Sequence, residues 1–180
     1  GFSLSLWVKP DFVTGMERTL VAKTVGTTPQ DHIWSMALVN GSALQFRLRT
    51  GPTTTELSTS PSSIFSGTWY HVVGAFDGTT MRIYLNGALM AEAAASGNMG
   101  FHPQAPAAIA ARSNGTAPFS GWVDDLRLFD RGLTQQDVVD ILLGNGITTS
   151  SSDQQPRILR SGHLQVPEGR WNRGMLLHMS

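Results

Sequence analysis

The 180-residue chain contains no cysteine, so no disulfide framework and no thiolate metal site can form. It also has no excess of charge, because 13 basic residues balance 13 acidic ones. Electrostatics therefore give no reason to expect binding to nucleic acid or an anionic membrane. No apolar run approaches the length of a membrane span, so we expect no membrane insertion. Any signal peptide is expected to lie outside this sequence.

Charged residues are also scarce, at 14% of the chain, well below the usual quarter. Glycine, serine and threonine take their place, as in a turn-rich β protein with uncharged polar faces. The apolar fraction of 41% is enough for a sizeable core. At this length a single domain is the first expectation.

Strand signals recur at intervals of about ten residues, with turn residues between them, which is typical of a β-sandwich or barrel. The clearest stretch runs from Trp69 to Gly87, where Asp77-Gly78 and Asn86-Gly87 predict tight turns of an antiparallel meander. The predicted strands are residues 2–8, 19–23, 33–39, 43–49, 54–58, 69–76, 81–85, 88–91, 107–111 and 119–129.

One short helix is predicted after the last of these strands. Thr134 and Asp137 resemble a capping box, and Leu133 is placed to pack on Val138 as a hydrophobic staple. Gly144 would end the helix after about ten residues. The helix is expected to cover the sandwich and not to form a second domain.

We expect the domain body to span residues 1–146, followed by a linker-like segment at 147–156 that shows no periodicity. The tail at 157–180 contains two stretches that could be strands. They either complete the sheets of the same domain, which we favour, or begin a neighbouring domain. A lone strand cannot bury its own apolar face, which favours the first interpretation.

Three segments in this order resemble one known family: Phe2–Pro10, Trp69–Gly87 and Phe119–Thr134. They are similar to the laminin-G-like, concanavalin A-like jelly-roll domains that bacteria attach to secreted glycosidases, lyases and adhesins. The resemblance extends from Phe2 to Leu143 and implies an all-β fold with two antiparallel sheets. The family usually has one more strand before the first of these segments. The C-terminal tail could occupy that place, as in a permuted chain.

Catalytic relatives in this fold use paired carboxylates two positions apart on one strand face. Here Glu17, Glu56, Glu92 and Glu168 stand alone in the sequence. His71 beside Tyr70 is the only candidate for a lyase-type base, but adjacent strand residues face opposite ways. We therefore expect no enzyme activity.

The best metal candidate is the pair Asp124 and Asp125, because hard carboxylate oxygens suit Ca²⁺. The resemblance supports a structural calcium ion near this strand. In the alternative interpretation, one aspartate caps a turn or pairs with Arg127 or Arg131, and the other faces solvent.

The five tryptophans fall into different contexts. Trp7 and Trp69 lie within the family's strand motifs and are expected in the core. Trp34 and Trp122 either pack in the core or offer a ring face to a sugar. Trp171 lies in a polar stretch typical of a saccharide-contacting loop, and His102 lies in a polar loop at 97–104. The candidate carbohydrate-binding residues are thus Trp34, Trp122, His102 and Trp171.

The resemblance implies non-catalytic recognition of a glycan or glycoconjugate. The chain would be an accessory module beside other domains of a larger parent protein, outside the cell or at its surface. A structural or adhesion module that binds protein is the main alternative, and a glycan-degrading enzyme is the third. An exposed aromatic patch would favour the sugar-binding interpretation.

Overall fold

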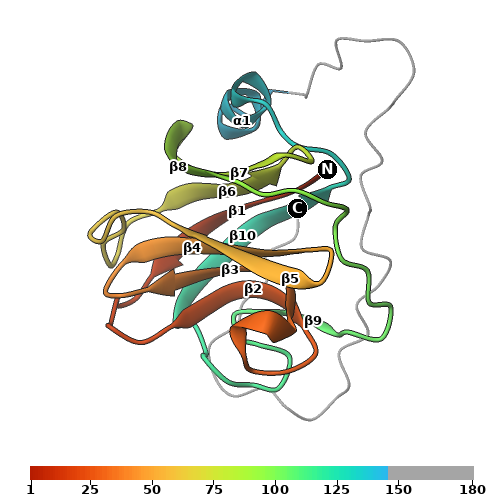
Figure 1. Ribbon diagram of the computed structural model, residues 1–180. Coiled ribbons are helices and arrows are strands. Elements are labelled where there is room, and N and C mark those ends of the chain that lie inside the picture. Colours follow the sequence, from red (N-terminus) through yellow and green to blue (C-terminus); the bar gives the residue numbers. More distant parts are fainter. Residues whose placement is uncertain (146–180) are drawn as a thin grey trace.

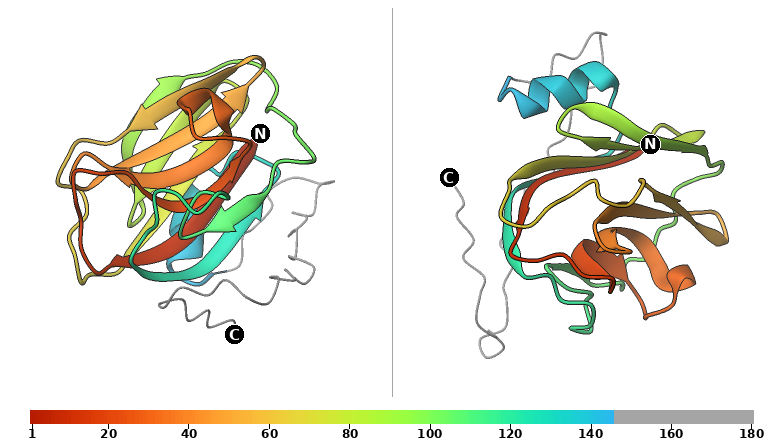
Figure 2. Two further views of the ribbon diagram at one scale, coloured as in Figure 1. Left: turned by 90° about the horizontal axis from the view of Figure 1, so that it is seen from below. Right: turned by 90° about the vertical axis from the view of Figure 1, so that its left-hand side faces the viewer.

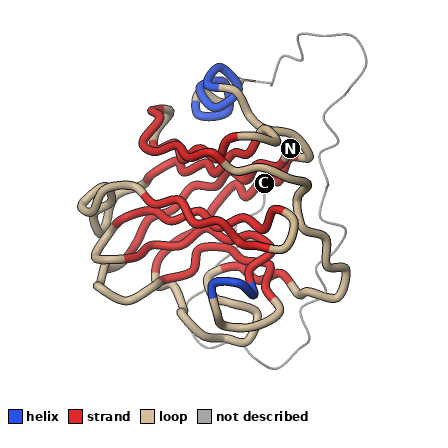
Figure 3. The backbone as a smooth tube through the Cα atoms, viewed as in Figure 1, coloured by secondary structure: helices blue, strands red, loops and turns tan. Residues whose placement is uncertain are grey.

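The structure, a computed structural model, describes residues 1–145, which form two stacked antiparallel sheets of five strands each (Figures 1 and 3). Sheet A has the order β10 (Gly121–Phe129), β1 (Phe2–Pro10), β6 (Tyr70–Phe76), β7 (Thr80–Leu85) and β8 (Ala88–Ala94). Sheet B has the order β5 (Thr53–Ser58), β4 (Ala43–Thr50), β3 (His32–Val39), β2 (Arg18–Thr24) and β9 (Ala107–Ile109). The predicted all-β sandwich is confirmed.

The core lies between the two sheets and follows directly from alternation along the strands. Leu44, Phe46 and Leu48 point inward from β4, and all three are fully buried. Residues of sheet A such as Leu4 and Leu6 meet them from the other side and are equally buried. Because side chains alternate across a strand, every second residue of these strands instead points out of the sandwich.

Gly74 in β6 lies where side chains of sheet B approach the backbone of sheet A closely. A Cβ atom built on it would lie 2.8 Å from the Phe46 ring and 3.0 Å from the terminal methyl group of Met36. Only glycine therefore leaves room for the inward side chains of sheet B at this point.

The helix α1 (Gln135–Leu142) lies on the outer side of sheet A, away from sheet B (Figure 2). Thr134 and Asp137 form the predicted capping box. Leu133, Val138 and Ile141 pack with Val73, Ala75, Tyr84 and Phe129, forming a second small core outside the sandwich. The helix covers only part of this face.

The meander of β6, β7 and β8 is also confirmed, since these strands are consecutive neighbours in sheet A. The core placement predicted for Trp69 is wrong, because this side chain is exposed, and Trp7 is half-buried on the outer face. Predictions for the tail at 157–180 and the segment at 147–156 lie outside the described residues. Within residues 1–145 neither α1 nor the short 3₁₀ helix η1 (Pro29–Asp31) could span a membrane.

Candidate functional site

The outer face of sheet A beyond α1 carries side chains from β10, β1 and β6 in aligned rows. In one row Trp122 of β10 lies opposite Lys9 of β1. In the next row Asp124 lies opposite Trp7, and Trp7 lies opposite His71 of β6. Directly opposite residues on a sheet share a face, so these five side chains point outward together.

Trp69 extends the first row on the other side of Lys9. It immediately precedes β6, and continuing the β1–β6 register by one residue sets it opposite Lys9. The two chain segments stay adjacent there, because the Gly67 amide donates to the Pro10 carbonyl at 2.7 Å. Trp69 is 41% exposed and Trp122 is 48% exposed. We call Trp7, Lys9, Trp69, Trp122 and Asp124 the tryptophan face.

His71 packs against Trp7 and fixes its position in this face. It is fully buried, its Nε2 lies 2.8 Å from the Ser5 hydroxyl, and its ring centroid lies 5.3 Å from that of Trp7. The His71 backbone amide donates to the Asn86 side chain, which fixes the start of β6. The imidazole therefore positions the Trp7 indole, whose outer side remains accessible.

Burial also lowers the pKa of His71 to about 4, because the charged ring would lose its hydration. The unfolded chain therefore binds more protons than the folded one as the pH falls from about 6.5 to 4, and stability decreases in that window. We expect a loss on the order of 3 kcal/mol between pH 7 and pH 4. Urea denaturation of the protein at several pH values, and of His71→Asn, measures it. The stability of the variant should depend less on pH. The pH dependence that remains is assigned to His32, whose pKa burial also lowers. An identical pH dependence in both proteins would refute this role.

Asp124, which is part of the tryptophan face, and Asp125 lie at a bulge of β10. The ladder with β1 shifts by one residue here, and Asp125 has a φ of 48°. The Arg127 guanidinium donates to both carboxylate oxygens of Asp125, at 2.8 and 2.6 Å, while Asp124 accepts from the Asp125 amide. This matches the ion-pair interpretation. No group of three His, Asp or Glu side chains suited to a metal ion occurs among the described residues.

The other candidate sugar-binding residues do not gather on this face. Trp34 matches the core-packing alternative, because it is 5% exposed and its ring packs 5.6 Å from that of Phe2 in the core. His102 lies half-buried in the loop between β8 and β9, and it stays a prediction. Trp171 lies outside the described residues.

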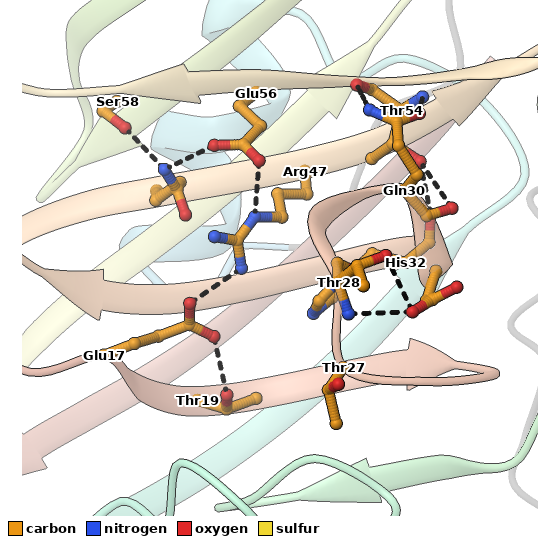
Figure 4. A network of polar contacts seen from close by, with 12 residues as sticks. Glu17, Thr19, Thr27, Thr28, Gln30, His32, Arg47, Thr54, Glu56 and Ser58 are labelled. Carbon is orange, nitrogen blue, oxygen red and sulfur yellow. Dashed lines mark hydrogen bonds and ion pairs between the residues drawn. The ribbon is translucent and has the colours of Figure 1, made fainter.

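Two of the four isolated glutamates come together on the outer face of sheet B. Glu17 and Glu56 both contact Arg47, at 3.0 and 3.2 Å (Figure 4). A glycosidase acid needs a raised pKa. Burial pushes the pKa of Glu17 upward, but hydrogen bonds from Arg112 and the charge of Arg47 outweigh it and leave that pKa lowered. This pair is therefore poorly suited to general acid catalysis.

Sequence reasoning missed Lys9, Trp7 and Trp69 as surface residues. A signal for Trp7 was present, because Leu4, Leu6 and Val8 form the buried set of β1 and Trp7 has the opposite parity. For Trp69 no such signal exists, since it precedes the strand.

The chain belongs to the concanavalin A-like lectin/glucanases superfamily, whose Laminin_G_3 family model matches residues 1–139. No curated protein sequence matches the chain.

Solved structures with this fold include several carbohydrate-binding domains. A candidate carbohydrate-binding protein from Bacteroides ovatus is 20% identical, with a TM-score of 0.59 over 77% of this chain. Domain 4 of the extracellular arabinanase AbnA from Geobacillus stearothermophilus, in complex with arabinotriose, is 22% identical, with a TM-score of 0.57 over 78% of this chain. The chain spans 39% and 66% of the lengths of these two proteins.

A third relative is the CBM40 domain of the Ruminococcus gnavus IT-sialidase bound to α2,3-sialyllactose. It is 15% identical, with a TM-score of 0.62 over 78% of this chain and 82% of its own length. At these identities the likeness shows the shared fold.

Proposed function

We propose that this chain is a non-catalytic glycan-binding module of a larger secreted or cell-surface protein. The observation that carries the proposal is the tryptophan face. Two exposed indoles, Trp69 and Trp122, flank Lys9 on one open sheet surface, and Trp7 lies in the next row.

The spacing of the two indoles suits a short run of sugar rings. Trp122 lies on β10 and Trp69 just before β6, on either side of β1, so about 10 Å separates their backbones, twice the distance between neighbouring strands. This is close to the length of two linked pyranose rings. Each ring can stack its C–H groups on one indole, with apolar surface buried on both sides. Lys9 and Asp124 then provide a hydrogen-bond donor and acceptors for hydroxyl groups.

Structural relatives support the same class of ligand. Two of them are bound to saccharides, arabinotriose in one case and sialyllactose in the other. One relative is a domain of an extracellular enzyme, which agrees with an accessory module outside the cell. The arrangement of Glu17 and Glu56 around Arg47 argues against a glycosidase.

Glycan-array binding of the full chain, followed by titration of the best neutral oligosaccharide, tests the proposal. We expect Trp69→Ala and Trp122→Ala each to weaken binding by about tenfold. Phe101→Ala is the matched control, because Phe101 is an even more exposed aromatic residue in a loop outside the face. Unchanged affinity in both tryptophan variants, or an equal loss in the Phe101 variant, would exclude this face as the site.

A calcium ion at Asp124 and Asp125 remains part of the proposal. It would require Arg127 to release Asp125, since both oxygens of that carboxylate already accept from the guanidinium. The melting temperature in calcium and in chelator tests it, with Asp124→Asn as the control. A calcium-dependent rise that the variant abolishes supports the site, and no change in either protein removes it.

The edge strand β8 favours the second candidate function, a protein-interaction module. Leu89 and Met90 are 45% and 42% exposed there, at the end of sheet A. An unpaired strand edge with apolar side chains can pair with another chain. Failure to bind any glycan, together with self-association that Met90→Lys prevents, would favour this function.

A further inference from the structure

The outer face of sheet B holds one carboxylate between two arginines. The Arg112 guanidinium donates to Oε1 of Glu17 through Nη2 at 2.7 Å and through Nε at 3.2 Å. Arg47 donates to the other oxygen, Oε2, at 3.0 Å (Figure 4). Each oxygen of one carboxylate is thus held by a different guanidinium, which is a strong, charge-assisted arrangement.

The two arginines are fixed by separate parts of the fold, whereas Glu17 belongs to the loop before β2. Arg47 lies on β4 and is nearly fully buried, and Arg112 follows β9 and also donates to the Thr27 carbonyl at 2.9 Å. The strands β3 and β2 lie between β4 and β9. The Arg47 and Arg112 guanidiniums therefore hold fixed positions, and we call this pair the clamp. The Glu17 loop places its carboxylate between them.

Several buried polar atoms beside the clamp have no hydrogen-bond partner within residues 1–145. They are Ser35 Oγ, Gln45 Oε1 and His32 Nε2. Ser35 lies directly opposite Arg47 on the same face, and Gln45 lies two residues before it on β4. His32 is close enough for the Arg47, Arg112 and Glu17 charges to act on it. Unsatisfied buried polar groups are costly and need an explanation.

We propose that this face binds a carboxylate-bearing saccharide of the uronate class, whose carboxylate replaces that of Glu17 between Arg47 and Arg112. The ring hydroxyls meet the unpartnered atoms of Ser35, Gln45 and His32, which can donate to or accept from hydroxyl groups. The exchange conserves charge, because one carboxylate leaves the clamp for solvent as the other enters. This site lies on the opposite sheet from the tryptophan face and is a second, independent one.

The Glu17 loop makes few backbone hydrogen bonds to the rest of the described fold, and this permits the exchange. Between Asp11 and Glu17 the backbone is tied to the rest of the fold by the Asp11 amide bond to the Ser120 carbonyl and by the Thr14 carbonyl, which accepts from Gly41 at 3.1 Å. Glu56 also contacts Arg47, but it lies on the edge strand β5, is 35% exposed at its side chain and does not reach Arg112. The Glu17 carboxylate therefore occupies the position proposed for the ligand carboxylate.

Chemical-shift titration of the ¹⁵N-labelled full chain with D-glucuronate, D-glucose and acetate tests the proposal. We expect saturable shifts at the Ser35 and Arg47 amides with glucuronate, at much lower concentration than with glucose or acetate. Glu17→Gln should tighten glucuronate binding by about tenfold, because the internal competitor is gone. Arg112→Gln should weaken it by at least about tenfold, and Arg112→Lys by less, because the charge remains but the fork is lost.

Glu56→Gln is the matched control, since it makes the same charge change against the same arginine and should alter affinity by less than about twofold. Equal tightening in the Glu17 and Glu56 variants would reduce the effect to net charge and overturn the proposal. So would acetate binding as well as glucuronate, or a Glu17→Gln protein that melts lower and binds no glucuronate. The Trp69→Ala/Trp122→Ala double variant should keep glucuronate binding, so failure of the tryptophan face is distinguishable from failure of this site.

Discussion

Phe46→Ala should lower the free energy of unfolding by about 4 kcal/mol, the usual size for a buried phenylalanine. Phe46 is fully buried, and it lies in β4, an inner strand of sheet B. Its ring fills the space above Gly74, where sheet A has no side chain. Removal of the ring therefore leaves a cavity that neither sheet can fill without moving its backbone.

Urea denaturation measures this loss, with Phe101→Ala as the matched control at an exposed position. The control should stay within about 0.5 kcal/mol of the unchanged protein. Gly74→Ala tests the same contact from the other sheet and should cost about 1–3 kcal/mol by overpacking. Combining Gly74→Ala with Phe46→Leu should cost less than the sum of the two changes. Strict additivity would mean that the two residues do not share this space.

Asp137→Ala should cost about 3 kcal/mol, because one carboxylate holds both the capping box and an arginine. Arg131 donates to its two oxygens at 2.7 and 2.8 Å, and the Thr134 amide and hydroxyl donate at 2.8 and 2.7 Å. Asp137 is nearly fully buried, so its removal leaves these donors without an acceptor. The first turn of α1 would then lose its cap and its link to Arg131.

Asp140→Ala on the same helix is the control, since within residues 1–145 the Asp140 carboxylate accepts only from the exposed Gln136 side chain. It should change stability by less than about 0.5 kcal/mol. The hydrogen bond from Arg131 outweighs the opposing effect of burial and lowers the pKa of Asp137 to about 2. The Asp137 contribution is therefore complete above about pH 4 and is lost as the pH falls toward 2. Equal effects of the two alanine variants would show that the capping network contributes little.

The strands and the helix were predictable because their signals are local. Alternation in β4 placed Leu44, Phe46 and Leu48 inward, and all three are in the core. The cap at Thr134 and the turn at Asp77-Gly78 also depend on neighbouring residues only. Trp7 shows the limit of a motif, since its place in the family's strand motif suggested the core, whereas its parity in β1 puts it on the outer face.

Neither candidate site could be assembled from the sequence, because each depends on register between distant strands. Lys9 and Trp122 meet only through the pairing of the first and last strands of the body. Glu17 and Arg112 are 95 positions apart and meet only because β9 joins the edge of sheet B beside β2. Asp124 and Asp125 were visible as a pair, but the partner that Asp125 takes, Arg127, was one of two alternatives.

The sequence by itself determined which residues are strands, where the helix begins and which side chains form the core, because periodicity, turns and caps act over a few residues. Only the tertiary structure decided which outward side chains become neighbours, because strand order and register bring together residues from opposite ends of the chain. The tryptophan face and the Glu17 clamp are both products of that second step.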